Sequence, residues 1–290
     1  MSVAAPGPEW LLVDGSSLIF RAFYGVPDTV KSPDGRSVNA VRGFLDLLAR
    51  LIADRRPRRL LVARDDDWRP QFRVDLIPSY KAHRTAEPVP PGLEPQMPVV
   101  MEVIAALGLP SVGVAGFEAE DVIASVVAAE AGPIEIVSGD RDLFALVCDP
   151  RVRILYPEGM GRLREVDEAD IERRYGIPGR AYADFAILRG DPSDGLPGLP
   201  GVGEKKAADL VRRHGGVAGL LESGSLGPHQ AEYLRRALGV VTPVATIPLP
   251  DFSREPLGPP ARPEALRGLA ERHGLGGALA RLARAIEALP

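Results

Sequence analysis

Three short apolar runs, each ending in an aspartate, constrain the fold of this chain more than any other feature of its sequence. They are Trp10 to Asp14 (WLLVD), Leu60 to Asp65 (LLVARD) and Ile134 to Asp140 (IEIVSGD). Short apolar runs bounded by polar residues are typical of fully buried strands. In a parallel sheet the ligand crevice lies beyond the carboxyl ends of the strands. We therefore expect Asp14, Asp65 and Asp140 to point into one crevice.

Segments with helical periodicity separate these runs. They are Val38 to Ala53, Met97 to Leu107 and Glu120 to Ala131, the last two each followed by a glycine that would end a helix. The segment PSVGV, residues 110–114, predicts a further short strand, and DLFALV, residues 142–147, a further helix. This alternation predicts an α/β fold with a central, mostly parallel sheet flanked by helices.

The second part of the chain has a different sequence pattern. From about Tyr175 it shows short helical segments broken by Gly and Pro, without further convincing strand runs. A Pro- and Gly-rich stretch, Thr242 to Pro263, leads to a terminal helix predicted over Glu264 to Leu289. We predict an α/β core at residues 1–174 and a helical region at residues 175–290.

Composition excludes several classes of protein. No apolar run approaches the roughly 20 residues that cross a bilayer, and the N-terminus lacks the pattern of a secretory signal, so we expect a cytoplasmic protein without a membrane partner. The single cysteine cannot form an intramolecular disulfide. The four histidines lack metal-ligand spacing, which argues against a zinc site.

Carboxylates are concentrated in short motifs. GFEAEDV, SGDRDLF and GDPSDGLPG each carry two or three acids within a few residues. An isolated acid of this kind is usually a helix cap or a turn residue. Gathered in one crevice, however, so many acids would repel one another unless cations lay among them. The candidate metal ligands are Asp14, Asp65, Glu118, Glu120, Asp121, Asp140, Asp142, Asp191 and Asp194.

A ligand set made only of oxygen atoms selects hard cations such as Mg²⁺ or Mn²⁺. Two such ions about 4 Å apart can activate a water and stabilise the leaving oxygen of a phosphoryl displacement. Phosphodiester hydrolysis fits this inventory better than acyl transfer or redox chemistry. The net charge of −4 does not exclude a nucleic-acid substrate, because neutralising nine carboxylates would give −4 + 9 = +5.

Five blocks carry a family resemblance. In chain order they are VDGSSLIFRAFY, FRVDLIPSYKAHR, GFEAEDV, SGDRDLFALV and GDPSDGLPGLPGVGEKKAADLV. Together they resemble the 5′-nuclease family, which includes flap endonucleases and the 5′-3′ exonuclease domain of bacterial DNA polymerase I. The match runs from about Trp10 to Leu221, with weaker similarity to about Asp251. It implies a PIN-like core, and Met1 with the absence of polymerase motifs favours a free-standing bacterial form.

The resemblance divides the acids between two or more ions. It implies a first ion held by the acids that match Asp14, the second-motif aspartate, Glu118, Glu120 and Asp121, some of them through water, and a second among Asp140, Asp142, Asp191 and Asp194.

Two positions depart from the family pattern. Glu120 stands where Asp is usual, and its extra methylene would shift it toward a supporting role. The run Asp65, Asp66, Asp67 leaves the second-motif acid open: strand continuation favours Asp65, whereas spacing back from Phe72 favours Asp66.

The segment from Arg69 to Arg84 interleaves cations with aromatics, a composition that suits single-stranded DNA, although an ordinary solvated loop has similar residues. By the resemblance it forms the base of a helical arch at about residues 69–95, which clamps the 5′ end. Arg21 near the first acid would contact the scissile phosphate. The candidate catalytic residues are Lys81, Arg84 and Arg21, and the candidate DNA contacts of this part are Tyr24, Arg73 and Tyr80.

The run GLPGLPGVGEKKAADL resembles a helix-hairpin-helix at about residues 184–214. Its glycines would let backbone amides approach a duplex phosphate, although any Gly-rich turn before a helix has this composition. Such contacts position DNA without reading its sequence. The resemblance also implies a bound K⁺. The candidate DNA-binding residues here are Gly198, Gly201, Gly203, Lys205 and Lys206.

These observations together predict a structure-specific 5′-3′ exonuclease and flap endonuclease of replication and repair. The expected partner is DNA with 5′ flaps, nicks or free 5′ ends, bound by a monomer. Two alternatives remain open: a catalytically weak protein of the same fold that binds branched DNA, and an RNA-directed 5′-nuclease.

Overall fold

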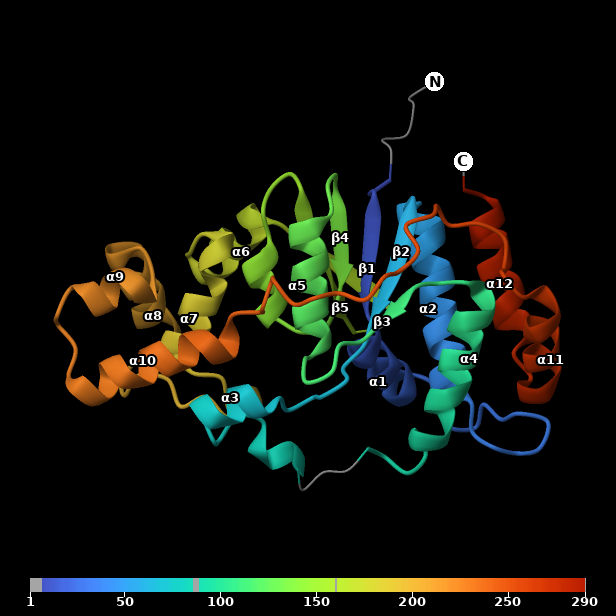
Figure 1. The fold of residues 1–290 in the computed structure, drawn as a ribbon, viewed down its shortest axis with the longest axis horizontal. Coiled ribbons are helices and arrows are strands. Elements are labelled where there is room, and N and C mark those ends of the chain that lie inside the picture. The colour runs from blue at the N-terminus through green and yellow to red at the C-terminus, as the bar shows by residue number, and fades with distance from the viewer. Residues whose placement is uncertain (1–6, 86–88, 160, 290) are drawn as a thin grey trace.

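The structure, a computed structural model, describes residues 7–85, 89–159 and 161–289. A six-stranded sheet lies at its centre (Figure 1). Its strands are β1 (Trp10–Asp14), β2 (Arg59–Ala63), β3 (Ser111–Val112), β4 (Ile134–Val137), β5 (Val152–Glu158) and β6 (Arg162–Val166).

The strand order is β3-β2-β1-β4-β5-β6. Strands β1 to β5 pair in parallel, and only β6 runs antiparallel to its neighbour β5. The predicted α/β fold with a mostly parallel sheet is therefore confirmed. The strand order reverses between β1 and β4, and the carboxyl ends of strands beside such a switch point form the usual ligand crevice of these sheets.

Helices cover both faces of the sheet. Leu11 and Val13 of β1 face a core that contains apolar residues of five helices, whereas Trp10 and Leu12 face the core on the opposite side. This alternation follows from the period of two along a strand. The five helices are α1 (Gly15–Gly25), α2 (Asn39–Arg55), α4 (Met97–Leu107), α11 (Pro263–His273) and α12 (Gly276–Glu287).

The opposite core joins the sheet to a helical region, which extends to the left in Figure 1. It begins with α5 (Ala119–Ala129) and the 3-10 helix η3 (Asp142–Leu146). Further along the chain follow α6 (Glu168–Tyr175), η4 (Gly179–Ala181), α7 (Tyr182–Arg189), η5 (Pro192–Asp194), α8 (Glu204–His214), α9 (Val217–Glu222) and α10 (Pro228–Val241).

The predicted arch segment is only partly described. Within residues 69–95 the structure contains α3 (Gln71–Leu76) and η1 (Ala82–Thr85), and it enters η2 (Glu94–Gln96) at the end. Residues 86–88 of the predicted arch lie outside the described residues, as do residues 1–6, 160 and 290 of the predicted domains. Among the described helices, none is both long and apolar enough to cross a membrane.

The end of the chain differs from the sequence-based expectation. The predicted terminal helix is two helices, because Gly274 adopts a left-handed backbone (φ 67°) that ends α11. These helices pack on α2 and α4 at the far side of the sheet from α8 and α10 (Figure 1). The predicted helical region 175–290 is therefore not one packed unit, since its last two helices complete the core of the α/β part.

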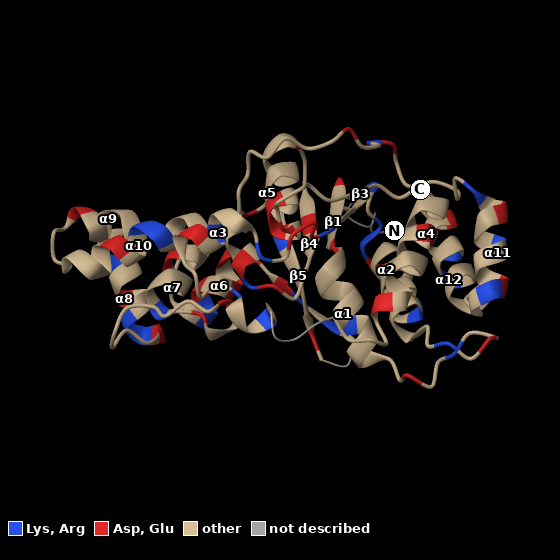
Figure 2. Cartoon of the chain, turned by 60° about the horizontal axis from the view of Figure 1, so that its bottom comes forward, with Lys and Arg blue, Asp and Glu red and all other residues tan. Residues whose placement is uncertain are grey.

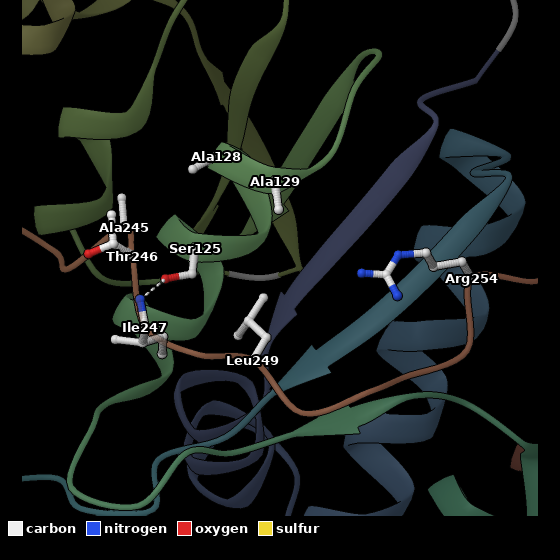
Figure 3. Close-up of a pocket in the computed structure, with 8 residues that line it drawn as sticks. All are labelled: Ser125, Ala128, Ala129, Ala245, Thr246, Ile247, Leu249 and Arg254. Carbon is white, nitrogen blue, oxygen red and sulfur yellow. Dashed lines mark hydrogen bonds between the residues drawn. The ribbon is translucent and has the colours of Figure 1, made fainter.

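An extended strap, residues 242–262, connects the two ends of the molecule across α5. Ser125 of α5 holds it: the Ser125 hydroxyl donates to the Val244 carbonyl (3.0 Å) and accepts from the Ile247 amide (3.2 Å). A pocket of about 400 Å³ lies between strap and helix, with Leu249 and Arg254 in its lining (Figure 3). It borders the later turns of α5 and not the acidic start of that helix.

Candidate functional site

The site begins at the switch point of the sheet, where β1 ends in Asp14. This residue also begins α1: its carboxylate accepts the Ser17 amide (3.0 Å) as a helix cap. The Ser138 hydroxyl, at the end of β4, donates to its other oxygen (2.5 Å). Asp14 is buried, and burial together with the neighbouring Asp65 and Asp140 raises its pKa to about 7.

The structure distinguishes the neighbouring aspartates that follow β2. Asp65 lies close enough to Asp14 to raise its pKa, and its carboxylate accepts the Ala119 amide at the start of α5 (2.8 Å). Asp66 is exposed, and its amide donates to the carbonyl of Phe117. Of the two alternatives that the sequence leaves open, the geometry favours Asp65 as the acid of the crevice.

A second carboxylate group lies around η3 and η5. Asp142 is buried, and burial together with Asp140 raises its pKa well above the ordinary value of an aspartate. It shares a hydrogen bond with the carboxyl group of Asp194, whose pKa burial also raises. Asp140 holds the turn through its carboxylate, which accepts the Asp142 amide (2.9 Å). Asp140, Asp142 and Asp194 therefore form one strongly interacting acidic cluster.

Asp191 stands slightly apart from this cluster. Its carboxylate caps η5 by accepting the Ser193 amide (2.9 Å), and Arg189 lies 3.3 Å from its other oxygen. These contacts satisfy much of the negative charge of Asp191. Its predicted role as a metal ligand stays a prediction.

The start of α5 carries three buried acids that two buried cations contact. Arg73 contacts Glu118, Glu120 (2.8 Å) and Asp121 (2.7 Å), and its side chain is 0% exposed. The Lys81 ammonium lies 2.5 Å from Glu118. Burial alone would lower the pKa of Lys81, but Glu118 and Glu120 raise it above its usual value. The acids are therefore paired from within the chain.

Asp121 makes four contacts within the protein. One carboxylate oxygen accepts from Arg73 and from the Val244 amide of the strap (2.8 Å), and the other accepts from Arg73 (3.0 Å) and the Glu118 amide (3.1 Å). All four contacts come from the protein, so Asp121 ties α5 to α3 and to the strap. Its predicted role as a metal ligand stays a prediction.

Two predicted DNA contacts are wrong. Arg73 is fully buried, and Tyr80 is 1% exposed with its hydroxyl donating to Glu118 (2.7 Å). Arg73 further donates to the Val240 carbonyl of α10 (2.9 Å). A DNA strand cannot reach either side chain in this arrangement. The excess of buried negative charge at α5 explains the difference, because an unpaired buried carboxylate is far costlier than a cation withdrawn from the surface.

The other predicted phosphate contacts differ in exposure. Arg21 and Tyr24 project from α1 into solvent, Tyr24 with 73% of its surface exposed. Arg84 is half-buried, and its guanidinium lies 3.6 Å from Asp194 at the acidic cluster. Lys81 is buried against Glu118, although its amide donates to the Asp194 carbonyl (3.0 Å) and so fixes η1 beside that cluster.

The predicted helix-hairpin-helix region consists of α7, a glycine-rich turn and α8. Gly198 needs a left-handed backbone (φ 68°), and a Cβ there would lie 2.5 Å from the Arg189 carbonyl oxygen. Gly201 and the α8 residues Lys205 and Lys206 are exposed. Gly203 is exposed at the N-cap of α8 and leaves the first amides of that helix uncovered by a side chain. Gly203 therefore presents an exposed helix N-terminus, the feature that binds phosphates in many proteins.

Acidic residues gather at one place in the fold, beside β4 and the start of α5 (Figure 2). Among the residues that the structure describes, no three His, Cys, Asp or Glu side chains converge in a geometry that would hold a metal ion. The donor chemistry nevertheless fits a hard divalent cation, because burial and mutual repulsion, which raise the pKa values of these carboxyl groups, disfavour their ionised forms, and a bound cation would offset both effects. The acids that remain open to an ion are Asp14, Asp65, Glu120, Asp140, Asp142 and Asp194.

Sequence reasoning did not identify Ser138, which binds the carboxylate of Asp14. Its signal is a hydroxyl residue at the end of a buried strand, directly before the Gly-Asp pair of SGDRD. It also did not identify Trp68, an exposed aromatic residue in the run that contains the second acid.

Comparison with known families gives two matches that together span most of the chain. The 5′-3′ exonuclease N-terminal resolvase-like domain matches residues 9–176, and the 5′-3′ exonuclease C-terminal SAM fold matches residues 177–241. The last two helices, α11 and α12, lie beyond both matches.

Similar proteins share much of the sequence. A 5′-3′ exonuclease of Streptomyces coelicolor is 51% identical and is matched over 94% of this chain and 98% of its own length. A 5′-3′ exonuclease of Mycobacterium tuberculosis is 44% identical, over 97% of this chain and 98% of its own. The DNA polymerase I of Mycobacterium bovis is 40% identical over 74% of this chain but only 24% of its own length.

Solved structures share the fold at lower identity. The bacteriophage T5 flap endonuclease, in a complex with DNA and metal ions, has a TM-score of 0.65 and 18% identity over 97% of this chain and 98% of its own. Human GEN1 in complex with Holliday junction DNA has a TM-score of 0.62 and 17% identity, over 95% of this chain and 72% of its own. The two family matches and the identity to the bacterial proteins show that the chain belongs to the 5′-3′ exonuclease family.

Proposed function

We propose that this protein is a divalent-metal-dependent 5′-3′ exonuclease and flap endonuclease that hydrolyses phosphodiester bonds of DNA in replication and repair. One observation carries the proposal: carboxylates from β1, β2, β4, α5, η3 and η5 lie near one another at the switch point of the sheet, and burial raises the pKa values of Asp14, Glu120, Asp142 and Asp194 among them. The substrate would be DNA with a 5′ flap, a nick or a free 5′ end, bound by a monomer in the cytoplasm.

Two sets of residues would hold the cations, which we propose to be Mg²⁺ or Mn²⁺. Asp14, Asp65 and Glu120 would form one set, with Glu118 as a support that Lys81 keeps in place. Asp140, Asp142 and Asp194 would form the other set, with Asp191 at its edge. When bound, paired ions of this kind supply an activated water and stabilise the leaving oxygen of the phosphodiester. No protein nucleophile is then required.

Cations of the chain would orient the DNA strand at this site. Arg84 lies beside Asp194 and retains a partly exposed guanidinium, so it can neutralise a phosphate that approaches the cluster. Arg21 and Tyr24 on exposed α1 would contact the scissile phosphate and the terminal base. Lys81 would act from within the crevice, where its ammonium already balances Glu118.

The duplex part of the substrate would bind the helix-hairpin-helix. The turn with Gly198, Gly201 and Gly203 offers backbone amides, and Lys205 and Lys206 offer charge to the phosphates. Backbone carbonyls of the same turn are the proposed site of a K⁺ ion. Because these groups contact only the backbone of DNA, they would select substrates by shape and not by base sequence.

Cleavage of a labelled 5′-flap duplex tests the proposed function. With Mg²⁺ or Mn²⁺ the protein will release products from the 5′ side, and EDTA will stop the reaction because carboxylates alone cannot activate water for this displacement. Parallel RNA and hybrid flaps at fixed salt distinguish a DNA nuclease from an RNA-directed one. Tight flap binding without cleavage in any divalent ion would instead support the catalytically weak binder, which the Glu120–Arg73 contact of 2.8 Å favours.

A further inference from the structure

Trp68 occupies an unusual position for a tryptophan. The sequence has two tryptophans: Trp10 is 1% exposed in the core, where it packs edge-on against Phe252, whereas Trp68 is 40% exposed. Among the aromatic contacts of the described residues, none involves Trp68. An exposed aromatic ring offers a free face on which a nucleobase can stack.

The loop around Trp68 is held firmly although its tip is exposed. The amides of Asp66 and Asp67 both donate to the Phe117 carbonyl (3.3 Å). After the tip, the Arg69 amide donates to the Asp67 carboxylate (2.9 Å), and the Arg69 guanidinium donates to the carbonyls of Tyr80 (2.7 Å) and Pro78 (2.9 Å). These bonds fix both ends of the loop, so the indole is presented with little loss of conformational freedom on binding.

The position of this loop relates Trp68 to both halves of the site. It lies three positions after Asp65 of the crevice, so the two Cα atoms are at most about 11 Å apart. On its other side Arg69 binds the backbone of Tyr80, which directly precedes Lys81, and Arg84 follows beside Asp194. An exposed ring on a loop that starts at the acidic crevice and is tied to the backbone before Lys81 suits a nucleotide whose base is unstacked, since every base has a π-face.

We propose that Trp68 is a stacking platform for an unpaired nucleobase of the DNA strand that enters the acidic crevice. The inference rests on the proposed function for its ligand, but it concerns binding and not cleavage. The ring would favour frayed or single-stranded 5′ ends over fully paired ends, because only an unpaired base can leave its helix to stack on it.

Tryptophan fluorescence tests this proposal directly. A 5′-flap duplex titrated into the wild-type protein in EDTA will quench Trp68 emission, while Trp68→Leu, which retains only buried Trp10, will show little change. Trp68→Leu will weaken flap binding by about 5-fold to 150-fold, and Trp68→Phe, which keeps a ring, will stay within about 3-fold of wild type. Circular dichroism of both variants checks that the fold is retained.

An abasic flap supplies the decisive comparison. If Trp68 stacks on a base, the binding defect of Trp68→Leu will disappear when the flap nucleotides lack bases. An equal defect on abasic and normal flaps, or no quenching in the wild type, would overturn the proposal. Flap cleavage by the wild-type protein in Mg²⁺ is measured in parallel. Quenching without cleavage would contradict the proposed function alone, and cleavage without quenching would contradict the role of Trp68 alone.

Discussion

Replacing Asp142 by Asn will reduce cleavage of a 5′-flap duplex by at least about 100-fold at saturating Mg²⁺. The substitution keeps the size of the side chain and its reach toward Asp194, but it removes the negative charge that would bind a cation. Asp142 is only 6% exposed and lies between Asp140 and Asp194. It is thus at the centre of the acidic cluster, where one lost charge affects the proposed ion most.

Stability separates loss of chemistry from loss of fold in this variant. The pKa of Asp142 is raised, which means that its ionised form is disfavoured in the folded protein. Asp142→Asn should therefore melt in EDTA no lower than the wild type. Asp251→Asn is the matched control, because the Asp251 side chain is fully exposed at 104%, and its cleavage rate should not change. A cleavage rate of Asp142→Asn within about 3-fold of the wild-type rate would show that Asp142 is not a ligand of the proposed metal site.

Replacing Arg73 by Met will lower the free energy of unfolding by about 3–5 kcal/mol, the usual cost of leaving a buried charge without its partner. Glu118, Glu120 and Asp121 would all lose this cation at once. For a chain of this size we expect a fall in Tm of roughly 6–20 °C. Because a bound divalent cation would balance part of the remaining charge, the fall should be smaller in Mg²⁺ than in EDTA.

Arg236→Met is the control for this experiment. Arg236 forms an exposed ion pair with Glu232 on α10, both with 52% of the side chain exposed, and such pairs contribute about 1 kcal/mol or less. Thermal unfolding of both variants, with and without Mg²⁺, gives the comparison. If Arg73→Met melts like Arg236→Met in EDTA, the buried cation is not what holds the acids of α5 together.

Much of the architecture can be predicted from the sequence because parallel strands bury both faces and so appear as short apolar runs. The runs that end at Asp14, Asp65 and Asp140 are β1, β2 and β4 with their following turns, and two of these strands flank the switch point. Their acids share a crevice for that reason. Strand β5 (VRILYPE) is interrupted by Arg153 and Pro157, and β6 is a charged edge strand, so neither shows such a run and neither was predicted.

Contacts between residues that are far apart in the sequence could not be predicted in the same way. Local spacing suggests that Arg73 and Tyr80 are surface groups of a cationic loop, yet both turn inward toward Glu118, some 40 residues later in the chain. Whether these side chains face inward or outward depends on the net charge of the folded crevice, and a local sequence pattern does not reveal that charge. The packing of α11 and α12 could not be predicted for the same reason. Their apolar faces are visible in the sequence, but the surface of α2 that they cover is not.

Diffraction from crystals soaked in Mn²⁺, with data collected at the manganese edge, tests most directly whether these acids hold metal ions. We predict anomalous peaks within about 2.3 Å of carboxylate oxygens of Asp140, Asp142 and Asp194, and a further peak beside Asp14 and Asp65. Peaks confined to other surfaces of the molecule, with the acids still paired only to Arg73, Lys81 and one another, would contradict the proposed metal-dependent mechanism.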